Sequence, residues 1–133
     1  MAHPIMFDPD DPTLEQVRMR ALALPGAVEK VTFGRPWFKA GKLFAMYGGG
    51  TKGPDGEQHE QSVLVHIDPE ELPARMQDLR FFVPSYVGPF GWLGIDVGGA
   101  DTDWTEIEEL LDASYRLAAP RTLVRELDAR ARD

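Results

Sequence analysis

Basic and aromatic side chains occur together in one short part of the sequence, between residues 33 and 47. Cations neutralise phosphates and aromatic faces accept stacked bases, so this combination could form a nucleic-acid-binding surface. The residues that could do so are Arg35, Trp37, Lys39, Lys42 and Phe44. The same residue types are also common in a plain β-hairpin, where aromatic side chains enter the core and lysines near the turn are solvated. Both interpretations remain open at the sequence level, and the second is the commoner one.

A second cluster of aromatic and glycine residues could line a ligand pocket. It consists of Tyr86, Gly88, Gly91 and Trp92, in which the tyrosine and the tryptophan each offer a polar group at the end of an apolar ring. Alternatively the glycines form a turn and the aromatic rings pack. Packing is the preferred interpretation for Trp92, whereas for Tyr86 the two interpretations are balanced.

No residue is assigned a catalytic role. The chain has no cysteine, and none of its three serines lies in a nucleophile-elbow context. Residues 48–53 contain the residue types of a phosphate-binding loop but not its spacing. His66 and Asp68 alone do not make a zinc site. We therefore expect a protein that is not an enzyme and that has no cofactor and no metal.

The composition predicts one globular domain that spans residues 1–133. Hydrophobic residues make up 43% of the chain and charged residues 27%, which is typical of a folded protein. No apolar run approaches the roughly 20 residues of a membrane helix, and the first residues lack the pattern of a signal peptide. We expect a cytoplasmic location and no membrane partner, and the lack of cysteine is compatible with this.

Charge is distributed unevenly along the chain. The net charge is −8, which opposes nonspecific attraction to nucleic acid. Residues 13–47 nevertheless hold six cations and two anions, whereas residues 96–112 hold seven anions and no cation. The candidate hairpin therefore lies in the only markedly basic part of an acidic chain.

The candidate hairpin should have one apolar face and one mixed face. Residues 37–40 and 43–47 flank Gly41-Lys42, a pair suited to a type II′ turn, so facing residues alternate between two sets. The set expected in the core is Phe38, Ala40, Leu43 and Ala45, and the other set is Trp37, Lys39, Phe44 and Met46. A slip of one residue would exchange the two sets.

The remaining pattern predicts alternating helices and strands. Asp11 or Thr13 should cap a first helix that ends before Pro25-Gly26, and residues 28–33 are either a short strand or an extended entry. A polar loop over 48–61 should precede a strand over 62–67, and Asp68 should cap a short helix. Residues 81–87 and 92–97 are expected as strands, and Asp103 should open a long helix. Residues 1–11 and 121–133 are expected to be peripheral or mobile.

Several short motifs occur in an order that resembles the MmcQ/YjbR family of small bacterial proteins. The resemblance covers roughly residues 14–127. The matching pieces are Ala23-Leu24-Pro25-Gly26, Phe33-Gly34-Arg35-Pro36, Gly41-Lys42-Leu43-Phe44-Ala45, Asp68-Pro69-Glu70-Glu71, Pro84-Ser85-Tyr86-Val87-Gly88, Gly91-Trp92, Ser114-Tyr115 and Ala119-Pro120.

This resemblance implies an α+β two-layer sandwich in which an antiparallel sheet of about five strands packs against helices, in the order α-β-β-β-α-β-β-α. The fold should be similar to secretion-chaperone-like and CyaY-like domains. Members of the family are commonly labelled DNA-binding, which implies a module that contacts DNA through the candidate residues. The alternative is a module that binds a protein or a small molecule instead, as a monomer or a homodimer.

Overall fold

The structure, a computed structural model, describes residues 4–130, and its centre is a six-stranded antiparallel sheet of order β1-β2-β3-β4-β6-β5. The strands are β1 Val28–Thr32, β2 Arg35–Ala40, β3 Lys42–Gly50, β4 Gln58–His66, β5 Phe81–Phe82 and β6 Trp92–Asp96. The helices are α1 Pro12–Leu22, α2 Leu72–Met76, α3 Trp104–Ala118 and α4 Arg121–Arg130, with a 3-10 turn, η1, at Gly88–Phe90. The expected α+β class is confirmed, with one strand more than expected.

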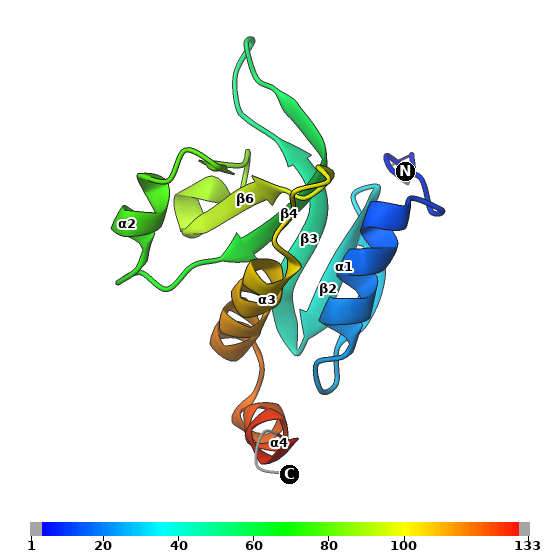
Figure 1. The fold of residues 1–133 in the computed structure, drawn as a ribbon, viewed down its shortest axis with the longest axis vertical. Coiled ribbons are helices and arrows are strands. Elements are labelled where there is room, and N and C mark those ends of the chain that lie inside the picture. Colours follow the sequence, from blue (N-terminus) through cyan, green and yellow to red (C-terminus); the bar gives the residue numbers. More distant parts are fainter. Residues whose placement is uncertain (1–3, 131–133) are drawn as a thin grey trace.

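Helices α1 and α3 cover one face of the sheet, which we call the core face (Figure 1). Strand residues alternate between two sides, and the side facing these helices carries Phe38, Ala45, Val63, Val65 and Leu93, all of them buried. Helix α3 contributes Ile107, Leu110, Leu111 and Tyr115 at helical spacing. The sequence pattern thus produces a single main core between sheet and helices.

A buried tyrosine fastens the start of α1 to the sheet. Asp11 caps the helix by accepting the Thr13 N–H at 2.9 Å, and its other oxygen accepts the Tyr47 hydroxyl at 2.6 Å. Burial and the hydrogen bond to Asp11 raise the pKa of Tyr47 far above its usual range. Burial alone would raise the pKa of Asp11, but hydrogen bonds from Tyr47, Thr13 and Gln61 together lower it. The predicted cap is confirmed.

The β2–β3 hairpin contains a bulge that the sequence pattern did not reveal. Phe38 pairs with Ala45 as predicted, but Lys39 pairs with Leu43, so the register shifts by one residue and Phe44 is the extra one. The prediction that Phe44 shares a face with Lys39 is therefore wrong. Its ring is fully buried in the core and meets Tyr115 edge-on, with centroids 5.5 Å apart.

Leu43 also changes sides because of this bulge. It was expected in the core next to Ala40, but it packs on the opposite face of the sheet. A buried serine on α3 holds the bulge in place: Ser114 Oγ donates to the Phe44 carbonyl at 2.6 Å and accepts the His66 N–H at 3.0 Å. The local register is thus determined by a tertiary contact.

Other differences concern the ends of elements. Strands β3 and β4 extend into the expected loop, of which only residues 51–57 remain outside strands. The expected strand over 81–87 stops after Phe82, and residues 85–91 form turns and η1. Helix α2 begins at Leu72, with Glu71 as its N-cap, rather than directly after Asp68.

The C-terminal segment is helical up to Arg130. Helix α4 packs Leu123, Val124 and Leu127 against the core, and Arg130 donates to the Ala23 carbonyl at 2.6 Å. Residues 1–3 and 131–133, which the sequence analysis also expected to be peripheral, lie outside the described residues. None of the helices within residues 4–130 is long and apolar enough to cross a membrane.

Candidate functional site

The side of the sheet that faces away from α1 and α3, here called the outer face, carries Trp37 and Lys39. Residues paired directly across antiparallel strands share a face, so Lys30, which pairs with Trp37, lies there too. Met46 and Leu64 continue the same row across β3 and β4. This row places an aromatic ring beside a cation on the β1–β2 side of the outer face.

A small cluster of buried residues forms the floor of the outer face. It consists of Met46, Leu64 and Trp92, against which Trp37, Leu43, Phe82 and Val87 pack. Within residues 4–130, no residue of a helix α1 to α4 belongs to this cluster. The floor of the outer face is therefore apolar, and Trp37 is partly exposed at its edge.

Phe33 adds a second ring next to Trp37. Their centroids lie 5.7 Å apart with the planes tilted by 56°. Phe33 and Gly34 form the two-residue turn between β1 and β2, with φ angles of 51° and 81°, as type I′ turns require. A phenylalanine is unusual in this left-handed conformation. The turn holds its ring, which is 62% exposed, beside the outer face.

The lysines of this region lack the carboxylate partners that most other cations within residues 4–130 have. Neither Lys30 nor Lys39 forms an ion pair with a carboxylate of residues 4–130. Lys42 lies exposed at the adjacent hairpin turn. The ammonium groups of Lys30 and Lys39 are available to an anionic ligand on the face that carries Trp37, whereas Lys42 pairs with Ala40, a residue of the core face.

Arg35 differs from the lysines because it already has an anionic partner. Its guanidinium donates to both carboxylate oxygens of Glu60, at 3.1 and 3.3 Å, and its side chain is only 13% exposed. The group lies so close to Gly48 that a Cβ at that position would clash with it. Of the predicted cations, Arg35 is the one that has an ion-pair partner among residues 4–130.

Trp92 lies in the floor of the outer face rather than on its surface. It is 8% exposed, and its ring stacks on His66 with centroids 5.6 Å apart and planes within 12° of parallel. The packing interpretation preferred for Trp92 agrees with this position. Phe44 lies on the other side of the sheet. The structure thus places Trp37, Lys39 and Trp92 on one face of the sheet and holds Arg35 in an ion pair with Glu60. Lys42 and Phe44 belong to the other face.

Tyr86 protrudes from the segment that borders the outer face. It has φ of 67° and its side chain is 90% exposed. The Val87 N–H donates to the Ser85 carbonyl at 2.8 Å, which closes a γ-turn around Tyr86. A non-glycine residue held in such a conformation costs on the order of 1–3 kcal/mol. Packing against the described residues does not explain why a tyrosine should occupy this position.

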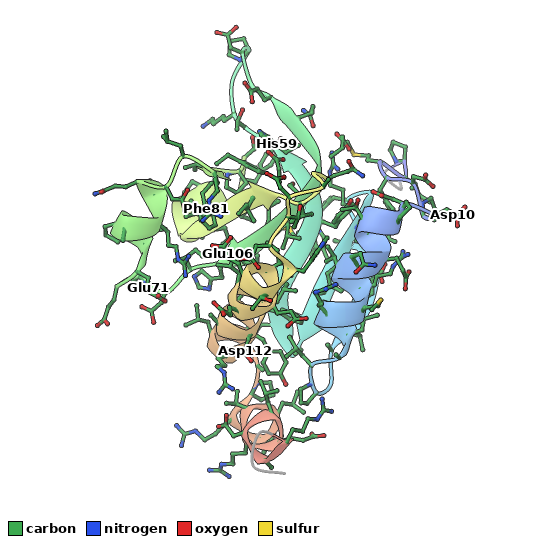
Figure 2. The ribbon with its side chains drawn as sticks, in the orientation of Figure 1. Asp10, His59, Glu71, Phe81, Glu106 and Asp112 are labelled. Atoms are coloured by element: carbon green, nitrogen blue, oxygen red, sulfur yellow. The ribbon has the colours of Figure 1, made fainter. Side chains whose placement is uncertain are left out.

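An acidic corner occupies the opposite part of the outer face, and the sequence analysis missed it. His59 lies where the β3–β4 hairpin leaves the sheet (Figure 2). Its ring stacks on Phe82 with centroids 3.9 Å apart, and its Nδ1 lies 2.8 Å from Asp96 Oδ1. Glu57 Oε2 is 3.6 Å from its Nε2. The contacts of His59 with Phe82 and Asp96 join residues far apart in sequence, so no local pattern could have revealed them.

Two further observations concern potential metal ligands and cavities in the structure. Among residues 4–130 there is no group of three or more histidine, aspartate or glutamate side chains arranged to hold a metal ion. A cavity of about 400 Å³ lies between α1, α3 and α4, lined by Met19, Leu111 and Leu127 among others, and no predicted site residue lines it. This cavity and the candidate site are therefore separate.

Lys30 and Phe33 are the residues that sequence reasoning missed. The Phe33-Gly34 pair could have indicated both residues, because it is suited to a two-residue turn. Such a turn fixes the register of β1 on β2 and places Lys30 opposite Trp37. The residue types of 28–33 fit both a strand and an extended entry, and only the strand leads to this register.

The YjbR family model matches residues 22–117. The match covers most of the chain and includes all six strands together with α2 and most of α3. The chain therefore belongs to the YjbR family. No curated protein matches it.

Proposed function

We propose that this chain is a binding module without enzymatic activity and that its outer face contacts nucleic acid. The observation that carries the proposal is the partly exposed ring of Trp37, with Lys30 directly opposite and Lys39 on the same face. A base can stack on the ring while the ammonium groups neutralise the adjacent phosphates.

The positions of the serines support the first part of the proposal. Two of them are buried and use their hydroxyls to hold backbone: Ser62 Oγ donates to the His59 carbonyl at 2.7 Å, and Ser114 Oγ donates to that of Phe44. A nucleophile must instead be reachable by substrate and by a general base.

The net charge of the molecule determines how strongly we expect it to bind nucleic acid. A net charge of −8 repels a polyanion at long range, so binding should be weak and should depend on local contacts. Only the few phosphates next to Lys30 and Lys39 can be neutralised on this face. The logarithm of the binding constant should fall with that of the salt concentration with a slope of about −0.7 to −0.9 per neutralised phosphate.

Fluorescence anisotropy with labelled oligonucleotides, at about 20 mM and about 200 mM salt, tests this proposal. The variant Lys30→Gln/Lys39→Gln should lose most of the binding and reduce the salt slope. The matched control is Arg121→Gln/Arg125→Gln, which removes two exposed cations from α4 and should bind nearly as the wild type does. The absence of binding at low salt would refute the proposal, and equal losses in both variants would show that only net charge matters.

A protein partner is the second candidate, because one exposed segment has no charge. No charged side chain lies between Arg80 and Asp96, although Val83, Tyr86 and Phe90 are 47%, 90% and 74% exposed. Exposed aromatic residues with few charges are typical of the centre of protein interfaces. The simplest form is a homodimer, which sedimentation velocity can detect. A dimer that Tyr86→Ser/Phe90→Ser abolishes would favour this candidate, and a strict monomer would remove its homodimeric form.

A further inference from the structure

We infer that the outer face prefers single-stranded nucleic acid to duplex and that Tyr86 is its second stacking residue. This inference rests on the proposed function and specifies which ligand the same surface takes. It is carried by three observations: the conformation of Tyr86, its position relative to Trp37, and the charge of the β3–β4 hairpin.

The backbone around Tyr86 is held firmly, although its ring is almost fully exposed. The Ser85 N–H donates to the Gly50 carbonyl at 2.8 Å and the Gly88 N–H to the Pro84 carbonyl at 3.0 Å, so both sides of the γ-turn are fixed. Glycine adopts this φ at no cost, whereas tyrosine does not. A strained, fixed and 90% exposed aromatic residue is best explained by contact with something outside the chain.

Tyr86 lies within reach of a ligand that is bound at Trp37. The neighbouring Val87 packs against the same cluster as Trp37, and Ser85 is anchored to the end of β3. From Met46, which pairs with Trp37, to Gly50 the strand rises roughly 13 Å at the usual spacing. Stacked nucleotides rise about 3.4 Å each along a strand, so about four of them would span this distance.

A duplex fits these groups poorly. Its bases are stacked on one another, so it offers no free base face to Trp37 or Tyr86, whereas a single strand does. The β3–β4 hairpin projects from the sheet at the end where Ser85 is anchored (Figure 1). This hairpin carries Lys52 against Asp55, Glu57 and Glu60. A rigid polyanion that approached this end of the sheet would meet those carboxylates, but a flexible strand can pass beside them.

The test compares one sequence as single-stranded DNA, as duplex DNA and as single-stranded RNA, by anisotropy with the full-length chain. We expect each single strand to bind at least about tenfold more tightly than the duplex. The measurement with RNA shows whether the protein prefers ribose or deoxyribose. Tyr86→Gly should lower single-strand affinity roughly fivefold to 100-fold, the usual range for one stacked base. Tyr86→Phe should retain it.

Thermal unfolding of the same variants separates binding from folding. Because glycine removes the strain, Tyr86→Gly should be at least as stable as the wild type while it binds less well, a combination that a structural role of Tyr86 cannot produce. Duplex binding as tight as single-strand binding would overturn the inference and leave the proposed function standing. Full affinity in Tyr86→Gly would also overturn it. The absence of binding by all three ligands would overturn the proposed function itself.

Discussion

The two faces of the sheet are both rich in aromatic residues, but they use these residues differently. On the core face Phe44, Tyr47 and Tyr115 are fully buried, and both tyrosine hydroxyls are hydrogen-bonded. On the outer face Trp37 is only partly buried, and it lies on the same face as lysines that have no anionic partner within the described part of the chain. The comparison teaches that residue type alone does not distinguish an aromatic residue that stabilises the core from one that is available for binding. What distinguishes them is whether helices pack on that face of the sheet.

The largest expected effect belongs to the core face. Phe44→Ala should lower the free energy of unfolding by about 3–5 kcal/mol, because it removes a fully buried ring from the contact between β3 and α3. Urea denaturation measures this change. Oligonucleotide binding, measured where the variant is still folded, should be nearly unchanged. A large loss of affinity without a loss of stability would contradict the assignment of Phe44 to the core.

A smaller stability effect is expected from the buried hydroxyl that holds α1. Tyr47→Phe removes the hydrogen bond to Asp11 and should cost about 1.5–3 kcal/mol, as for hydrogen bonds to charged groups. Folding lowers the pKa of Asp11, so its carboxylate stabilises the fold above the ordinary value of 3.8 and loses this effect as the pH falls through the lowered value. Urea denaturation at several pH values should therefore show a smaller penalty for Tyr47→Phe in acid. A constant penalty across that range would argue against the role of Asp11.

On the outer face the expected effect moves from stability to binding. Trp37→Leu should weaken single-strand binding by about 1–3 kcal/mol, the usual contribution of one stacked base. Its effect on unfolding should be smaller than that of Phe44→Ala, because the ring is only half-buried. Anisotropy and urea denaturation of both variants test the contrast directly. Equal stability losses at the two positions would break the comparison.

The smallest effect concerns the arginine at the margin of the outer face. Glu60→Gln leaves Arg35 without its anionic partner and should raise oligonucleotide affinity a few-fold, with a steeper salt dependence. Because half of the Glu60 side chain is exposed, the change in stability should remain below about 1 kcal/mol. Unchanged affinity in low salt would place Arg35 outside the binding surface.

Much of the fold could be predicted because its signals are local. The caps at Asp11 and Asp103 and the alternation of residues 92–97 each depend on neighbours in sequence, and the structure confirms them. The two-layer arrangement follows from the apolar faces of these elements. The family resemblance pointed to the same fold.

The errors arose where distant residues decide a local conformation. The bulge at Phe44 is held by a hydrogen bond from Ser114. Strand β5 ends early because turns and η1 follow it, although the residue types of this segment are also found in strands. The predicted set of candidate residues included Phe44, which lies in the core, and did not include Lys30, which pairs with Trp37. Both errors came from strand register, which single-sequence patterns specify weakly.

The contact between Ser114 and Phe44 also orders events during synthesis of the chain. The two residues are 70 positions apart, so the hairpin leaves the ribosome long before the helix that fixes its register. Until α3 has been made and has docked, the regular and the bulged pairing can compete. We therefore expect the amide protons around residues 39–44 to gain protection from hydrogen exchange together with those of α3, as a late step of folding rather than as an early local hairpin.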